Sequence, residues 1–117
     1  MLGLLCRYIL LEINNVLRYY NYVLMIASFS CIETELIFNY HRSRIIPSEI
    51  QRTALRKLLM LDSALNLMDL RIPPANRLEK LKGNLQGLHS IRINDQWRIC
   101  FRWQNGHAHD VKIIDYH

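Results

Sequence analysis

The sequence predicts an α+β domain in which N-terminal helices pack on a small twisted antiparallel sheet. Two features of the chain predict this class. Apolar residues recur at helical spacing in the earlier part of the chain, and apolar and polar residues alternate between turn signals in the last third. Helices that precede a run of neighbouring strands are typical of α+β domains. The length of 117 residues suits one such domain with one modest core.

The helical part of this domain follows a short strand predicted over residues 25–30. A weak helix is predicted over residues 33–40. A longer helix begins at Pro47 and Ser48, where Gln51 follows Ser48 at the spacing of a capping box. The apolar residues of this helix recur on one face and are expected in the core: Ile50, Ala54, Leu58, Leu61 and Leu65. Three cations lie off that face and are expected to be solvated: Arg52, Arg56 and Lys57.

The last third of the chain reads as a meander. Pro73 and Pro74 end helical structure, since proline lacks a backbone N–H and restricts the residue before it. Residues 72–87 are predicted to form an irregular basic loop. Two strands are predicted on either side of a turn at residues 94–96, and the hairpin signal Asn105-Gly106 leads into a final strand.

Residues 1–24 are expected to be an extension that precedes a domain of residues 25–117. They are rich in Leu, Ile and Tyr, but Arg7, Glu12 and Arg18 leave apolar runs too short to span a bilayer. The pattern of a secretory signal is not present either. The spacing is compatible with a partly amphipathic helix, and a second interpretation is that Met25 is the natural start.

Cysteine usage predicts free thiols in a reducing cytoplasm. Cys6, Cys31 and Cys100 are an odd number at irregular spacing, which does not suit a disulfide framework. His107 and His109, taken with Cys100, lack the spacing of a four-ligand zinc site, so no metal is expected.

Positive charge is concentrated in residues 71–102. This segment holds seven Lys or Arg residues and two acidic residues, so its net charge of +5 equals that of the whole chain. In the strand that starts at Trp97, apolar residues alternate with Arg98 and Arg102, and Arg92 lies on the strand before it. The alternation predicts three guanidinium groups displayed side by side on an exposed sheet face. A concentrated basic face of this kind indicates a nucleic-acid partner.

Three ordered motifs resemble the HigB-type toxins of the RelE superfamily. They are Asn-Arg-Leu-Glu-Lys-Leu-Lys-Gly at 76–83, the segment from Ser90 to Phe101, and the final Asp115-Tyr116-His117. The resemblance covers residues 25–117 and implies a RelE-like fold. It also implies a cytoplasmic type II toxin: a ribosome-dependent endonuclease that cleaves translated messenger RNA and is neutralised by a helix-turn-helix antitoxin of the HigA type. In that family a ribose 2′-hydroxyl attacks the adjacent phosphate without a metal or other cofactor.

The resemblance assigns site residues by position. It implies catalytic roles for Glu79, Lys82, Arg98, Asp115, Tyr116 and His117. RNA binding is expected of four further cations in the basic segment: Arg77, Lys80, Arg92 and Arg102. Within these sets, Lys82, Arg98 and Arg92 are expected to bind phosphate and stabilise the transition state. His117 is expected to be an acid or base, because its ordinary pKa lies near neutrality.

The other catalytic residues have different expected roles. Asp115 is expected to orient or to accept a proton, Tyr116 to stack on a base or donate a hydrogen bond, and Glu79 stands where some members carry a histidine. The chain departs from the family at Asn84 and Leu85, where an Asp and an Arg are usual, and at His89, where a Tyr is common.

Two alternative functions share this expected fold. One is a ParE-like inhibitor of DNA gyrase that cuts no RNA, and the other is an inactive remnant that binds RNA or an antitoxin. Lys82, Arg98 and the terminal motif favour the nuclease, because a gyrase inhibitor has no need of an acid/base set. Leu85 and the extra N-terminal residues favour the remnant. Fold alone does not separate the three, since function belongs to the site.

Overall fold

The order of elements confirms an α+β domain with helices first. The computed structural model describes residues 26–116, so the expected extension at 1–24 lies outside the described residues, as do Met25 and His117. Within residues 26–116, two α-helices, α2 (Ile32–Phe38) and α3 (Ser48–Ser63), precede four strands: β1 (Glu79–Lys80), β2 (His89–Arg92), β3 (Trp97–Gln104) and β4 (His107–Asp115). Three short 3₁₀ helices connect them: η1 (Leu67–Arg71), η2 (Pro74–Asn76) and η3 (Gly83–Leu85). None of the helices within residues 26–116 is long and apolar enough to cross a membrane.

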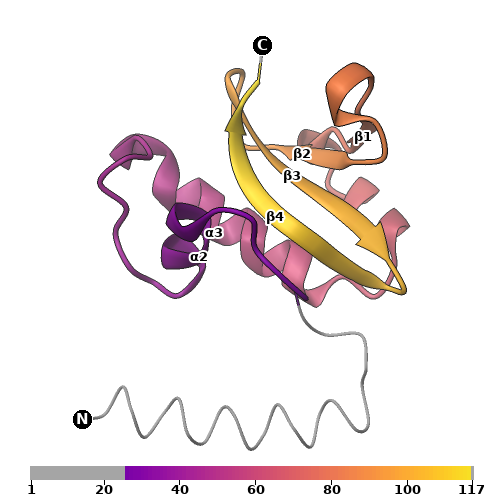
Figure 1. Ribbon diagram of the computed structural model, residues 1–117, viewed down its shortest axis with the longest axis horizontal. Helices are drawn as coiled ribbons and strands as arrows, with labels where there is room; N and C mark the ends of the chain where they lie inside the picture. The colour runs from indigo at the N-terminus through magenta and orange to yellow at the C-terminus, as the bar shows by residue number, and fades with distance from the viewer. Residues whose placement is uncertain (1–25, 117) are drawn as a thin grey trace, which may run out of the picture.

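The four strands form one antiparallel sheet in the order β1-β2-β3-β4. β3 and β4 make a long twisted hairpin with α2 and α3 beside it (Figure 1). The hairpin turn predicted at Asn105-Gly106 is confirmed, with φ values of 55° and 79° at the two residues. These left-handed conformations match the two-residue turn whose twist suits a hairpin.

The core lies between α3 and one face of the sheet. Ile91, Ile99 and Ile113 face one another across β2, β3 and β4, and all three belong to the buried cluster that includes the apolar side of α3. Four of the five residues expected on that side are buried: Ile50, Ala54, Leu58 and Leu61. The fifth was wrong: Leu65 is 56% exposed, because α3 ends at Ser63 and the chain turns away.

The start of α3 does not use the expected capping box. Pro47 is the N-cap residue and no side chain caps the helix. Gln51 instead binds the loop before the helix: its Nε2 donates to the carbonyl oxygens of Ser43 (2.8 Å) and Ile46 (2.7 Å), and its Oε1 accepts the Ser43 N–H (3.1 Å). The prediction was wrong because spacing alone did not show that Gln51 has nearer acceptors in the preceding loop.

Lys57 is buried, which corrects the expectation that it faces solvent with Arg52 and Arg56. Only 4% of Lys57 is exposed, and its Nζ donates a short hydrogen bond to Oδ1 of Asn76, whereas the two arginines are exposed. Lys57 lies three residues after Ala54 and four before Leu61, which are both in the core, so its stem packs inward. Asn76 belongs to the segment expected to be an irregular loop, which in fact contains η2, β1 and η3.

The first described residues run parallel to β4. The expected strand over residues 25–30 is reduced to one isolated bridge between Phe29 and Val111. Backbone hydrogen bonds nevertheless link the two segments, from the Ala27 N–H to the Ala108 carbonyl (2.8 Å) and from the Val111 N–H to the Ser28 carbonyl (3.0 Å). This pairing covers the outer edge of β4 and protects it from other strands.

Candidate active site

Arg98 is the centre of the candidate site and is buried, which corrects the prediction that it is displayed on an exposed face. It is 7% exposed. Its Nε donates to Ser90 Oγ at 2.6 Å, and its Nη2 donates to the carbonyl oxygens of Arg77 (2.5 Å) and Ser90 (3.3 Å). Within residues 26–116 no group accepts a hydrogen bond from Nη1. The guanidinium is therefore held on one side and keeps donors on the other.

The strand register brings Glu79 to this guanidinium. Glu79 in β1 pairs with Ser90 in β2, and Ser90 pairs with Cys100, two residues from Arg98 in β3. Residues two apart on a strand share a face, so the Glu79 and Arg98 side chains lie on the same side of the sheet. Glu79 Oε1 is 3.7 Å from Arg98 Nε, and the Glu79 side chain remains 43% exposed. A carboxylate open to solvent thus lies beside a buried cation.

The residues at the end of β4, the neighbour of β3, lie close to Arg98 and to the turn before it. The Tyr116 N–H donates to the Gln96 carbonyl at 2.7 Å, which fixes the backbone beyond β4. The Arg98 guanidinium carbon lies 5.8 Å from the centre of the Tyr116 ring, within range of a cation–π interaction. Asp115 Oδ2 accepts a hydrogen bond from Gln96 Nε2 at 3.0 Å. The turn before β3 therefore positions both residues.

Charges around Arg98 act in both directions on its pKa. Burial lowers the pKa of Arg98 most, the Glu79 carboxylate and the Tyr116 phenol raise it, and the Arg92 and Arg77 charges lower it further. An arginine stays protonated in all of these circumstances. The site therefore contains a permanent cation, two neighbouring cations and one carboxylate in direct contact.

Arg92 is the cation directly opposite Arg98 in the sheet. Its Nη2 lies 2.6 Å from Asp95 Oδ1, and this contact holds the pKa of the Asp95 carboxyl below its usual range. Asp95 is fully exposed, so water screens the pair and leaves Arg92 available to an anion.

Two lysines lie in the loop after β1. A pocket of about 510 Å³ is lined by Lys80, Leu81, Lys82, Gly83, Gln86 and Gly87. Both lysines are exposed, and the positive φ of Gly83 (64°) and Gly87 (91°) allows the loop to fold back on itself. Lys82 and Glu79 are thus three residues apart on one short segment at the edge of the sheet.

His89, where the resemblance expects a Tyr, lies on the strand beside this loop. It pairs with Lys80 in β1, and its ring stacks on Phe101 with centres 6.1 Å apart. Burial, together with the Lys80 charge, lowers the pKa of His89, and its buried Nδ1 has no hydrogen-bond partner within the described residues. His89 is therefore held as a neutral ring at the base of the loop.

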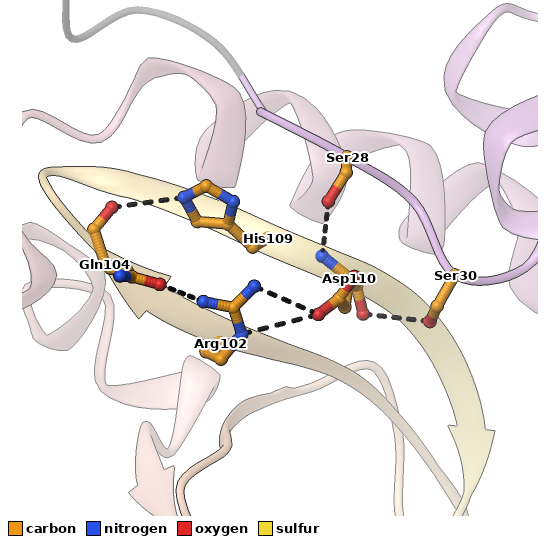
Figure 2. Close-up of polar contacts among 6 residues, drawn as sticks. All are labelled: Ser28, Ser30, Arg102, Gln104, His109 and Asp110. Atoms are coloured by element: carbon orange, nitrogen blue, oxygen red, sulfur yellow. Dashed lines mark hydrogen bonds and ion pairs between the residues drawn. The ribbon is translucent and has the colours of Figure 1, made fainter.

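Arg102 lies near the other end of β3, apart from the Arg98 group. It pairs with His109 beside the hairpin turn, about 13 Å along the strand from Arg98 at 3.3 Å per residue. Figure 2 shows its guanidinium between Asp110, whose Oδ2 is 3.2 Å from Nη2, and the side-chain oxygen of Gln104. The three guanidinium groups expected side by side are therefore two, Arg92 and Arg98, with Arg102 at a separate position.

A β-bulge explains the surroundings of Arg102. The register of β3 and β4 shifts between Cys100 and Arg102, and Asp110 on β4 has a left-handed φ of 53°. The Asp110 N–H donates to Ser28 Oγ (2.8 Å) and its carbonyl accepts from Ser30 Oγ (3.0 Å), as Figure 2 shows. The extra residue thus has its backbone groups satisfied by the N-terminal segment.

The described site unites part of the expected set. It brings together Arg77, Glu79, Arg92 and Tyr116 around the Arg98 guanidinium, with Lys80 and Lys82 on the adjoining loop. Asp115 is not among them: it pairs with Trp97 on the other face of the sheet, and its side chain binds Gln96. His117 lies outside the described residues. Three groups that position the others were not expected: Ser90, the Arg77 carbonyl and Gln96. Only Ser90 carried a signal, as a small polar residue that alternates with apolar Ile91.

This arrangement suits an oxyanion or a phosphate. A guanidinium with free donors offers charge-assisted hydrogen bonds, Glu79 can exchange a proton, and an exposed aromatic ring can stack. Within residues 26–116, no three His, Cys, Asp or Glu side chains are grouped so as to hold a metal ion.

Comparison with known proteins identifies relatives of the chain. A family described as the RelE-like toxin of the type II toxin–antitoxin system HigB matches residues 27–117. Toxin HigB-1 of Vibrio cholerae is 54% identical over 67 residues, which are 57% of this chain and 70% of that protein. Endoribonuclease HigB of Proteus vulgaris is 30% identical over 93 residues, 80% of this chain and 100% of that protein.

One solved structure also resembles the fold. A chain of the YoeB–YefM complex from Staphylococcus aureus has a TM-score of 0.44 and 21% identity, over 79% of this chain and 97% of that chain.

Proposed function

This chain belongs to the HigB family of RelE-like toxins in type II toxin–antitoxin systems, and we propose that it is an endoribonuclease that cleaves messenger RNA on the ribosome. One observation carries the proposal. The Arg98 guanidinium is fixed by Ser90 and the Arg77 carbonyl beside the Glu79 carboxylate and the Tyr116 ring. A cation that is fixed before the substrate arrives stabilises developing negative charge without a cost of reorganisation.

The proposed reaction is attack of a ribose 2′-hydroxyl on the adjacent phosphate, with departure of the 5′-oxygen. The Nη1 donors of Arg98 bind the phosphate oxygens as charge builds up on them, and Arg92, directly opposite, adds a second cation. Lys82 binds the same phosphate from the loop after β1. The cations thus stabilise the transition state, and the proton transfers need separate groups.

We assign the proton transfers to Glu79 and the terminal motif. Glu79, half exposed and beside Arg98, accepts the proton of the 2′-hydroxyl. His117, as the neutral-range acid of the motif, gives a proton to the leaving oxygen, with Asp115 orienting it. Tyr116 stacks on a base next to the cut, because its ring is held over Arg98 and is 38% exposed.

The ribosome supplies the orientation that the site itself lacks. Arg77 beside Arg98, Lys80 on the loop after β1 and Arg102 near the hairpin turn bind the RNA backbone without reading its sequence. A site that binds one phosphate and one base does not align a flexible message for in-line attack, so a surface that holds the message contributes much of the rate. In this proposal the toxin domain is residues 25–117 and acts in the cytoplasm, and the antitoxin is a helix-turn-helix protein.

The cellular test is expression of the chain followed by mapping of RNA ends and of plasmid supercoiling. We expect growth arrest with new RNA ends inside translated reading frames, and no such ends in the same messages when their start codons are removed. Growth arrest with intact messages and relaxed plasmids would instead support the gyrase inhibitor. Growth without either effect would support the inactive remnant.

A further inference from the structure

Lys57 is a buried cation that the proposed reaction does not use. Lysine is rarely buried unless paired, and only 4% of Lys57 is exposed. No carboxylate within the described residues lies within 4.0 Å of its ammonium group, whose hydrogen-bond acceptor is Oδ1 of Asn76. Burial lowers the pKa of Lys57 most, and the charges of Arg56 and Arg92 lower it further, so the ammonium lies within range of the Arg92 side of the site.

Asn76 connects Lys57 to the segment that carries the site. Asn76 is fully buried. Its Nδ2 donates to the Leu70 carbonyl at 3.1 Å and to the Met60 sulfur at 3.0 Å, and its own N–H donates to the Pro73 carbonyl at 2.9 Å. The side-chain amide is thus bonded to both α3 and η1, so it fixes the position of the chain at the end of η2.

The next residue reaches Arg98. Arg77 has a left-handed φ of 43°, and its carbonyl oxygen accepts the Arg98 Nη2 hydrogen bond. Two residues further on, Glu79 forms its ion pair with the same guanidinium. A continuous series of contacts therefore runs from α3 through Asn76 and the Arg77 carbonyl to Arg98.

We propose that Lys57 and Asn76 are positioning residues for the nuclease reaction: their hydrogen bond fixes the Arg77 carbonyl, which sets the orientation of the Arg98 guanidinium toward the phosphate. The kinetic part of this inference rests on the proposed function. An apolar side chain at position 57 would stabilise the fold at least as well, since burying a cation contributes little net free energy to folding. A core-filling role alone therefore does not require the amine.

The first test is independent of catalysis. The full chain is labelled with ¹⁵N, and the Arg98 Nε–H signal, which reports the bond to Ser90, is followed in Lys57→Met and in Arg56→Met. Lys57→Met keeps the length of the stem but removes the donor, and Arg56→Met makes the same change at the exposed neighbour. We expect the Arg98 signal to shift in Lys57→Met only, with hydrogen exchange at least about tenfold faster because the local bond opens more often.

The second test is a double-mutant cycle on the rate of message cleavage at saturating ribosomal complexes. Lys57→Met is expected to lower this rate about 10- to 100-fold, because displacements of about 1 Å have effects of that size. The half-saturating concentration should stay unchanged. In an Arg98→Lys background the same substitution should cost less than about threefold, since residues that act through one another are not additive. Lys57→Gln, which keeps an N–H donor, should recover part of the rate.

The outcomes separate the two proposals. An unchanged Arg98 signal in folded Lys57→Met, or full additivity with Arg98→Lys, would overturn the positioning role. A shifted Arg98 signal in a chain that cuts no message would support the positioning role and refute the nuclease. If Lys57→Met does not fold, Lys57→Gln is judged by the same signal: a shift smaller than that of Arg56→Met would overturn the inference, and a larger one would support it.

Discussion

The Tyr116 ring lies over Arg98, with 5.8 Å between the ring centre and the guanidinium carbon. Arg98 pairs with Ile114, and Tyr116 follows two residues later, so the two side chains are diagonal neighbours on one face of the hairpin. The last described residues thereby join the same site as the cation of β3. A site divided between β1, β3 and the end of β4 forms only when the whole sheet has closed.

Substitution of Arg98 should impair both stability and catalysis. Arg98→Ala leaves Ser90 Oγ and the Arg77 carbonyl without their donor, so the free energy of unfolding should fall by about 1–3 kcal/mol in urea titrations. Arg98→Lys keeps the charge but loses the fork of donors, and its cleavage rate should fall about 10²–10³-fold. Arg52→Ala, an exposed change on α3, is the control and should alter neither quantity. Full activity in Arg98→Lys would remove Arg98 from the catalytic set.

Glu79→Gln should lower the cleavage rate with little effect on folding. If Glu79 accepts the 2′-hydroxyl proton, the amide should cut about 10²–10⁴ times more slowly in single-turnover assays. The ion pair with Arg98 is 3.7 Å long and half exposed on the Glu79 side, so thermal stability should change little. Glu35→Gln, exposed on α2, is the matched control. A rate within twofold of the unchanged chain would mean that another group is the base.

Arg102→Ala should affect binding without affecting chemistry. Arg102 is at the hairpin end of β3 and is paired with Asp110, so it is distant from the phosphate that is cut. We expect the half-saturating concentration of ribosomal complexes to rise while the maximal rate stays unchanged. The logarithm of the binding constant should also fall less steeply with the logarithm of the salt concentration, by about 1 in slope. A fall in the maximal rate comparable to that of Arg98→Lys would place Arg102 at the reaction centre.

His89 should make the fold less stable in mild acid. Burial and the Lys80 charge lower the pKa of His89 below its ordinary value of 6.5. The unfolded chain therefore takes up this proton at a higher pH than the folded chain, and the free energy of unfolding should fall as the pH drops below about 6.5. His89→Gln should remove that part of the fall, and His41→Gln, which is exposed, should not.

Burial raises the pKa of Asp62, so this residue changes the free energy of unfolding with pH in the opposite direction to His89. Its contribution is the same in the unchanged chain, in His89→Gln and in His41→Gln. Urea titrations between pH 5 and pH 7 measure the difference. Identical pH profiles for His89→Gln and the unchanged chain would show that His89 takes up its proton equally in both states.

Local patterns were sufficient for the architecture but not for the buried cations. The hairpin followed from Asn105-Gly106 and from alternation, because turn geometry and strand faces are decided by neighbouring residues. Arg98 and Lys57 were expected in solvent because their partners come from distant segments: the Arg77 carbonyl for one and Asn76 for the other. A backbone carbonyl is present at every residue, so no pattern of side chains indicates which one an arginine will bind.

The site residues were predicted better by the family motifs than by the alternation of apolar and polar residues. Alternation placed Arg102 with Arg98, whereas the bulge at Asp110 and the length of β3 separate them. The three-residue spacing of Glu79 and Lys82 gave no indication that β1 pairs with Ser90 and so brings Glu79 to Arg98. The two-residue strand was too short to be recognised by periodicity.

The measurement that tests the central claim most directly is single-turnover cleavage of one defined message, free and bound in a programmed ribosome. We expect the full chain to cut the ribosome-bound message and to leave a 2′,3′-cyclic phosphate on the upstream fragment. The free message should be cut far more slowly, and Arg98→Lys should cut neither at a comparable rate. Equal cleavage of the free and bound message, or an upstream fragment that ends in a 3′-hydroxyl, would contradict the central claim.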